Sequence, residues 1–141
     1  MLPMSTPYES ADLILRLYEM RREDTMRKAR AWFGGFFPQS AQDLVSVIQG
    51  EHSAYFRMVT SYWDMAAALV NRGAIDAAMF NDANGEHVFI FAKLQPYLAE
   101  YRTAMGSQAY LAQVEQLVTG SPEALTKLEG VKRRLAAMAK K

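Results

Sequence analysis

Residues 51–72 form the longest helical pattern in the sequence, and they constrain the fold more than any other segment. After its first residue the segment has only three charged side chains, Arg57, Asp64 and Arg72. Gly73 follows at the position where glycine commonly ends a helix. A helix that is apolar over most of its circumference needs neighbours on most sides. We therefore expect this helix at the centre of a bundle, with Trp63 and Leu69 in the core.

The segments on either side also carry helix signals. Thr6-Pro7-Tyr8-Glu9 is a capping box with proline in the first turn, and Ser121-Pro122-Glu123 also caps a helix. Ser40 precedes an apolar stripe that Gly50 ends, and Gly106 separates two further stripes. The periodicity predicts helices over residues 7–20, 26–36, 41–49, 51–72, 87–105, 110–118 and 122–138, with the first two joined by a break at 21–24. A short helical turn, 74–80, and a loop, 81–85, complete the chain.

Apolar residues at helical spacing predict which faces turn inward. In the first helix they are Leu13, Leu17 and Met20, and in the last they are Leu125, Leu128, Leu135 and Met138. The run 87–91 is strand-like by propensity, but the sequence offers no partner strand. The sequence therefore predicts an all-α fold, a compact bundle of about six helices, in one domain over residues 1–141.

Composition restricts the class of protein. Half of the 141 residues are apolar and 22% are charged, which is typical of a folded globular chain. The absence of cysteine excludes disulfides, thiol nucleophiles and cysteine-ligated metals, and it fits the reducing cytoplasm, where we expect this protein. The longest charge-free stretches, 31–42 and 103–114, are shorter than the roughly 20 apolar residues of a spanning helix. We expect no membrane span.

The charges are close to balance but unevenly placed. The 16 basic and 15 acidic residues give a net charge of +1, whereas residues 121–141 carry six basic and two acidic side chains. Such a patch can bind phosphates or acidic membranes, but cations also stabilise the C-terminal end of a helix. No aromatic residues alternate with these charges, and the basic residues between 16 and 30 are largely offset by Glu19, Glu23 and Asp24. We therefore expect no nucleic-acid function.

Two Glu-His pairs are the only metal-like feature. Gly50-Glu51-His52 recurs as Gly85-Glu86-His87, and in each copy the histidine heads an apolar stripe. Two imidazoles that face one core, with carboxylates beside them, would suit zinc, iron or manganese. Adjacent residues point about 100° apart on a helix, however, and glycine followed by glutamate is ordinary at a helix start. We predict no bound metal ion or cofactor, and keep His52 and His87 as candidate ligand-binding residues.

The central helix also offers a polar strip. Arg57 and Asp64 are seven residues apart, so they share one face with Ser61. Such a pair is either an ion pair or solvated strip, or part of a binding site. The sequence has no nucleophile elbow, glycine-rich phosphate loop or kinase signature. No catalytic residue is therefore predicted, and whether the chain is an enzyme stays open.

The run Trp32-Phe33-Gly34-Gly35-Phe36-Phe37 is the strongest compositional anomaly. Large rings around two glycines either fold back into the core or insert into a partner or a membrane interface. Sixteen aromatic and nine methionine residues are a large apolar load for a bundle of short helices. The first helix presents Tyr8, Ile14 and Tyr18 beyond its main stripe. We therefore predict a two-fold homodimer that covers the leftover surface.

Three stretches carry a family resemblance. They are residues 13–22, LILRLYEMRR, residues 63–76, WDMAAALVNRGAID, and residues 93–102, KLQPYLAEYR. Together they resemble a family of uncharacterised bacterial all-helical proteins, a domain of unknown function, over residues 10–118. The resemblance implies a compact helical fold. It implies no activity and transfers no catalytic residue.

Two functional hypotheses follow. The surplus of aromatic and methionine surface, without catalytic groups, favours a soluble helical protein-interaction or scaffolding module. The polar strip and the paired histidines favour a small-ligand or metal-binding protein, an enzyme included, with a site built from His52, Arg57, Asp64 and His87. A concave pocket lined by these residues would favour the second hypothesis, and a solid core with an exposed apolar patch would favour the first.

Overall fold

The computed structural model describes residues 4–139, and within this range the regular elements are eight helices without a strand. They are α1 (Pro7–Arg21), α2 (Asp24–Gly34), α3 (Ala41–Gln49), α4 (Ser53–Asn71), α5 (Ala77–Ala83), α6 (Glu86–Met105), α7 (Ala112–Thr119) and α8 (Pro122–Ala139). The predicted all-α fold is confirmed. The number exceeds six because α1 and α2 are separate helices and α5 is a helix of its own. No helix of the described chain is both long and apolar enough to cross a bilayer.

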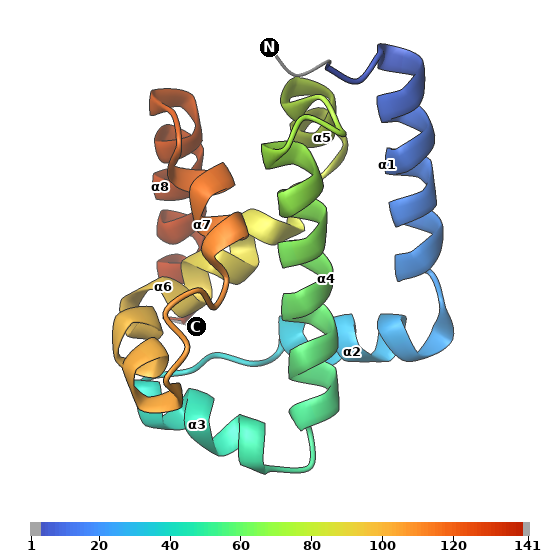
Figure 1. Cartoon of the computed structure of the whole chain (residues 1–141). Coiled ribbons are helices and arrows are strands. Elements are labelled where there is room, and N and C mark those ends of the chain that lie inside the picture. The colour runs from blue at the N-terminus through green and yellow to red at the C-terminus, as the bar shows by residue number, and fades with distance from the viewer. Residues whose placement is uncertain (1–3, 140–141) are drawn as a thin grey trace.

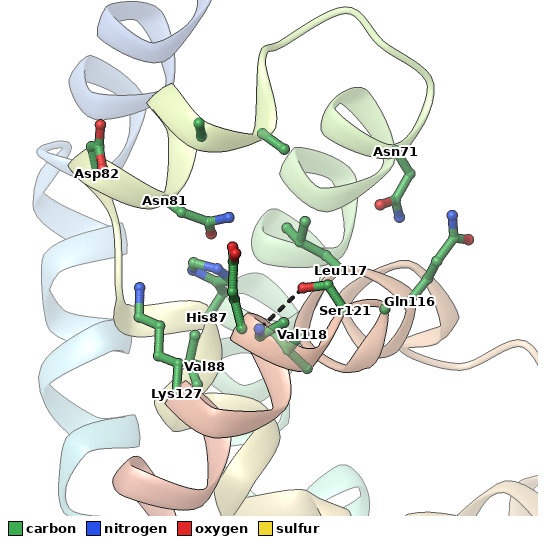
Figure 2. A pocket seen from close by; sticks show the side chains of 15 residues that line it. Asn71, Asn81, Asp82, His87, Val88, Gln116, Leu117, Val118, Ser121 and Lys127 are labelled. Carbon is green, nitrogen blue, oxygen red and sulfur yellow. Dashed lines mark hydrogen bonds between the residues drawn. The ribbon is translucent and has the colours of Figure 1, made fainter.

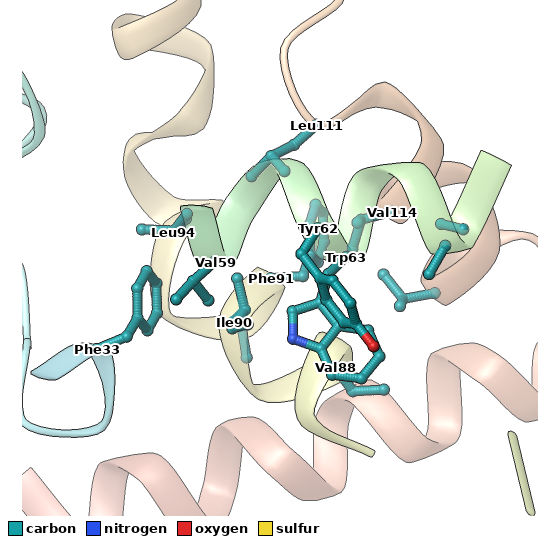
Figure 3. Packing of buried hydrophobic residues seen from close by; sticks show 14 of the residues in the cluster. Phe33, Val59, Tyr62, Trp63, Val88, Ile90, Phe91, Leu94, Leu111 and Val114 are labelled. Carbon is teal, nitrogen blue, oxygen red and sulfur yellow. The ribbon is translucent and has the colours of Figure 1, made fainter. Parts of the chain in front are cut away.

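Helix α4 runs through the middle of the bundle (Figure 1). It packs against α2, α3, α5 and α7, while α6 packs against α3, α7 and α8. Trp63 of α4 is 1% exposed, as predicted, but Leu69 is only partly buried at the edge of the core. Helices α4 and α6 each bury eight residues, so α4 shares the central position with α6. Figure 3 shows side chains of both helices interleaving around Trp63, Ile90 and Phe91.

The predicted helix ends are formed by short-range hydrogen bonds. Thr6 makes the capping box with Glu9, because each side chain accepts the backbone N–H of the other residue. The Ser40 hydroxyl accepts the N–H of Asp43 over 3.1 Å at the start of α3. Gly73 ends α4 with φ of +85°, a conformation that favours glycine. These helix boundaries therefore follow from local chemistry.

The segment after α4 differs from the prediction of a turn at 74–80 and a loop at 81–85. The Asp76 carboxylate accepts the N–H of Met79 over 2.9 Å, so the helix starts at Ala77 and continues to Ala83. The N–H of Asp76 donates to the buried Ser10 hydroxyl over 2.9 Å. This hydrogen bond ties the start of α5 to α1.

Three residues predicted to face inward are exposed. Met20 of α1 is 51% exposed, and Leu125 and Met138 of α8 are 45% and 50% exposed. Helix α8 packs mainly against α6 and α7, and Leu128 and Val131 fill that contact. The spacing of the apolar residues correctly predicted the direction of the buried face. Helices α1 and α8 have few neighbours, however, so the buried face of each is narrower than its apolar stripe.

The aromatic run after α2 is mostly part of the core. Phe33 is 3% exposed and its ring lies 6.0 Å from that of Phe56. Trp32 and Phe36 are half-buried and stack on each other at 5.0 Å, whereas Phe37 is 44% exposed. Most of this run therefore folds back onto α4.

Candidate functional site

Arg57 and Asp64, the predicted polar strip, do not pair in the structure. Arg57 is exposed, and its Nε atom donates to Ser53 Oγ on the same helix over 3.3 Å. Asp64 is half-buried, and its Oδ1 atom accepts the N–H groups of Gln113 and Val114 over 3.1 and 3.0 Å. The Asp64 carboxylate therefore caps the start of α7 instead of facing a ligand.

The two candidate histidines lie in different aromatic groups. His52, half-buried at the start of α4, stacks on Trp32 with ring centroids 5.1 Å apart. His87 is buried in the first turn of α6, 5.6 Å from the Trp63 ring and 5.1 Å from the Phe80 ring. Within residues 4–139, no three side chains of His, Cys, Asp or Glu converge as metal ligands would. The structure thus brings none of the four candidates together.

The two Gly-Glu-His copies have different roles. Gly85 is the N-cap of α6, whereas His52 itself occupies that position in α4. The Glu86 Oε2 atom accepts Trp63 Nε1 over 2.8 Å and Arg30 Nε over 2.9 Å. Glu86 therefore joins three helices, and it is not a free carboxylate beside His87.

His87 lines a cavity of about 540 Å³ between α5, α7 and α8 (Figure 2). We call this cavity the His87 cleft. Its polar lining consists of Asn71, Asn81, Asp82, Gln116, Ser121, Glu123 and Lys127. Its apolar lining includes Val88, Leu117 and Val118. Figure 2 shows Asn81, Ser121 and Lys127 disposed around the His87 ring.

The tight turn between α7 and α8 brings two walls of the cleft together. Gly120 lies in this turn, and a Cβ atom there would stand 2.5 Å from the Gln116 carbonyl oxygen, so only glycine fits. The Ser121 hydroxyl then accepts the N–H of Ala124 over 3.1 Å and starts α8. Gln116 and Lys127 consequently face the same cavity from successive helices.

The imidazole of His87 has no hydrogen-bond partner on either ring nitrogen within the described chain. The residue is 1% exposed. Burial, and to a smaller extent the Lys127 ammonium, lowers the pKa of His87 to about 4. The ring is therefore neutral at pH 7, with one N–H donor and one nitrogen acceptor. A buried polar group without a partner costs about 1–3 kcal/mol, so this arrangement is unusual in a structural residue.

The sequence offered a signal for His87 but not for the rest of the cleft. The sequence predicts a loop over residues 81–85, which contains Asn81 and Asp82, and Lys127 belongs to the basic segment 121–141. The cluster of amides between residues 71 and 84 was the only sign of a polar wall. Which of these side chains face His87 depends on how α5, α7 and α8 meet, and no spacing within one helix encodes that.

A second cavity, of about 330 Å³, has mainly apolar walls between α2, α6 and α8. Phe33, Phe89, Ile90, Leu135 and Met138 line it, with Arg30, Glu86 and Lys93. The Lys93 Nζ atom donates to the Phe33 carbonyl over 2.8 Å and the Gly34 carbonyl over 3.2 Å at the end of α2. Burial lowers the pKa of Lys93 to about 8, although Glu86 acts in the opposite direction. Lys93 thus caps the end of α2, and its ammonium is already hydrogen-bonded to two backbone carbonyl groups.

The comparisons with known proteins identify the family. The model of a domain of unknown function, DUF4760, matches residues 8–121. This match covers most of the chain, so the protein belongs to that family, in agreement with the resemblance found in the sequence. No curated protein and no solved structure matches the chain.

Proposed function

We propose that this member of the DUF4760 family binds a small, uncharged polar molecule in the His87 cleft. The observation that carries the proposal is the buried imidazole of His87, which lines a cavity of about 540 Å³ and whose two ring nitrogens have no partner within residues 4–139. A pocket with a few convergent polar groups and a titratable residue of shifted pKa is typical of a ligand site.

The unpartnered nitrogens favour a ligand that both donates and accepts hydrogen bonds. A neutral imidazole presents one donor and one acceptor, and a ligand that meets both removes the cost of leaving them unmet. An amide, a nucleobase edge or a vicinal diol has this character. At the imidazole itself, a cation would meet a neutral ring beside the Lys127 ammonium, so a charged amine is disfavoured at that position.

The rim of the cleft also fits an uncharged ligand. Lys127 contributes one positive charge, and Asp82 and Glu123 contribute two negative charges. Asn81, Gln116 and Ser121 add neutral donors and acceptors. The charges are mixed, so the rim recognises shape and hydrogen-bond pattern more than net charge.

Binding requires a small rearrangement of the rim. The ring nitrogens of His87 are shielded from solvent, while Glu123 and Lys127 are exposed residues of α8. Long side chains near the start of a helix change rotamer at a modest entropic cost. We expect the ligand to displace them and to contact the imidazole from the cleft.

The experiment follows the His87 ring nitrogens by ¹⁵N NMR while uncharged probes are added at millimolar concentration. Nicotinamide, adenosine and glucose represent an amide, a nucleobase with a ribose and a sugar. We expect at least one probe to shift the His87 signals in a saturable way. The matched variants are His87→Phe, which should lose binding, and His52→Phe, which should keep it.

Two results would contradict the proposal. The first is that no probe shifts the His87 signals. The second is that a probe binds equally well to the His87→Phe variant, because that ligand would then occupy another place.

A second candidate function, a protein-interaction module that forms a homodimer, is supported by the outward face of α1. Tyr8 is 85% exposed and Leu15 is 63% exposed. They are seven residues apart, so they lie on one side of the helix, whereas Ile14 packs against the core. We propose that α1 pairs with α1 of a second copy about a two-fold axis.

The lack of cysteine supports a cytoplasmic location for either function.

Light scattering during size exclusion tests the dimer at micromolar concentration. We expect twice the chain mass of 15.9 kDa for the native protein and a monomer for the Leu15→Glu variant. Leu125→Glu is the matched control, because Leu125 is an exposed leucine on α8. A monomeric native protein would contradict the proposal.

A further inference from the structure

Four arginines converge on one cavity at the corner between α1 and α2. The cavity measures about 420 Å³, and its lining residues are Tyr18, Arg21, Arg22, Arg27 and Arg30. We call it the arginine pocket. No acidic side chain is among its lining residues. It lies apart from the His87 cleft, with which it shares no lining residue.

Two of the guanidinium groups are held in place by residues at the junction of α5 and α6. Arg21 Nη1 donates to Asn84 Oδ1 over 3.0 Å, and its guanidinium lies 5.0 Å from the Tyr18 ring and 5.6 Å from the Trp63 ring. Arg30 Nε donates to both carboxylate oxygens of Glu86 over 2.9 and 3.2 Å. These contacts order the two side chains before a ligand arrives, which reduces the entropic cost of binding.

The other two arginines are available to a ligand. Neither Arg22 nor Arg27 has a side-chain hydrogen bond or an ion pair with residues 4–139, although the Arg22 guanidinium lies 5.6 Å from the Tyr18 ring. Of the four arginines, only Arg30 pairs with a carboxylate in the described chain.

The Glu23 carboxylate at this corner is already hydrogen-bonded. The Glu23 carboxylate accepts the N–H groups of Thr25 and Met26 over 2.9 and 3.0 Å. These hydrogen bonds lower the pKa of Glu23, and its negative charge stabilises the start of α2. From the sequence, Glu19, Glu23 and Asp24 were expected to offset the positive charge of the nearby arginines, but none of these three acids lines the pocket.

We propose that the arginine pocket binds a small molecule through a pyrophosphate or longer polyphosphate group. Arginine recognises phosphate oxygens with two parallel N–H donors, and several guanidinium groups around one cavity are suited to several oxygens. Arg21, Arg22 and Arg27 bring three charges that no carboxylate of residues 4–139 pairs. One phosphomonoester carries about 1.5–2 negative charges at pH 7, so two linked phosphates balance the pocket better than one.

The charge of the rest of the chain disfavours an extended polyanion. Residues 31–120 carry four basic and eight acidic side chains, a net −4. The chain outside the four pocket arginines carries 12 basic and 15 acidic side chains, a net −3. A nucleic acid that continued beyond the pocket would therefore gain no net positive charge, whereas a compact polyphosphate stays within the corner.

Titration calorimetry with sodium pyrophosphate at low ionic strength tests the proposal. The test variant is Arg22→Gln with Arg27→Gln, because both residues are exposed and hold no other element in place. The control is Arg72→Gln with Arg133→Gln, which removes the same charge from exposed sites just after α4 and on α8. We expect the test variant to lose at least tenfold in pyrophosphate affinity and the control to stay within about twofold of the native protein. Inorganic phosphate should bind the native protein more weakly than pyrophosphate.

Further ligands separate the possible sources of the polyphosphate group. If ADP binds at least as tightly as pyrophosphate and AMP does not, the pocket takes a nucleoside diphosphate, whereas weaker ADP binding indicates a free polyphosphate. Both results support the proposal. An equal loss of affinity in the two variants, or no heat with pyrophosphate, would overturn it. So would a single-stranded oligonucleotide that binds tenfold more tightly than pyrophosphate through the same arginines.

Discussion

The indole N–H of Trp63 donates to the Glu86 carboxylate over 2.8 Å, and the same oxygen accepts Arg30 Nε over 2.9 Å. Trp63 is 1% exposed and stacks on His87, while Arg30 lines the arginine pocket. One carboxylate at the start of α6 thus links the central helix to α2. It also connects Trp63, which stacks on His87 of the His87 cleft, with Arg30 of the arginine pocket.

Replacing Glu86 by alanine is expected to lower the free energy of unfolding by about 2 kcal/mol. The change leaves the Trp63 N–H buried without an acceptor and Arg30 without its carboxylate. Urea unfolding followed by circular dichroism measures the loss. Glu129→Ala is the control, because Glu129 forms an exposed pair with Lys132 at 3.4 Å, and it should change stability by less than about 0.5 kcal/mol. Equal losses in both variants would count against the role of Glu86.

Asp64→Ala is expected to cost about 1–2 kcal/mol, because it removes the acceptor for the N–H groups of Gln113 and Val114. Asp64→Asn keeps a side-chain oxygen and should recover much of the loss. Hydrogen exchange at these two amides localises the effect to the start of α7. Unchanged exchange in Asp64→Ala would show that the cap contributes nothing.

His87→Phe is expected to raise the free energy of unfolding by about 1 kcal/mol. Phenylalanine keeps a ring between Trp63 and Phe80 and removes two nitrogens that have no partner in the described part of the chain. His87→Ala should instead lower stability, because it leaves a cavity in the core. Thermal unfolding of the ligand-free proteins gives the comparison. A His87→Phe variant that is clearly less stable would mean that the ring nitrogens do have partners in solution.

The stability of the native protein should fall on acidification through His87. Its pKa is about 4 in the folded protein against the ordinary 6.5, so between these values the unfolded chain holds a proton that the folded chain does not. Above pH 6.5 the imidazole is neutral in both states, so His87 does not reduce the free energy of unfolding. Between pH 6.5 and pH 4 the free energy of unfolding decreases with falling pH, by up to about 1.4 kcal/mol per pH unit.

Urea unfolding of the native protein and His87→Phe at pH 7 and pH 5 isolates this effect. From pH 7 to 5 the native protein should lose about 2 kcal/mol more than the variant, because other groups titrate equally in both. Parallel losses would show that the buried imidazole is not responsible.

Local chemistry made much of the helical pattern predictable from the sequence. The starts of α1 and α3 depend on Thr6 and Ser40, whose side chains accept backbone N–H groups three residues away. Gly73 ends α4 because glycine readily adopts its positive φ. The inward faces were predicted less well at Met20 and Leu125. Apolar spacing gives the direction of a face, but the number of packed neighbours sets how wide its buried part is.

By itself, the sequence determined that this chain is all-helical, where most of its helices begin and end, and that α4 lies in the core. Only the tertiary structure decided the partners of Asp64 and Glu86, because those partners are remote in sequence. Asp64 meets the backbone of α7 49 and 50 residues away, and Glu86 meets Arg30 56 residues away. Helix packing thus places the carboxylates of Asp64 and Glu86 in structural contacts. It leaves the His87 ring nitrogens without hydrogen-bond partners, and three arginines of the arginine pocket without a carboxylate, within residues 4–139. Hydrogen bonds act over about 3 Å in space whatever the separation along the chain.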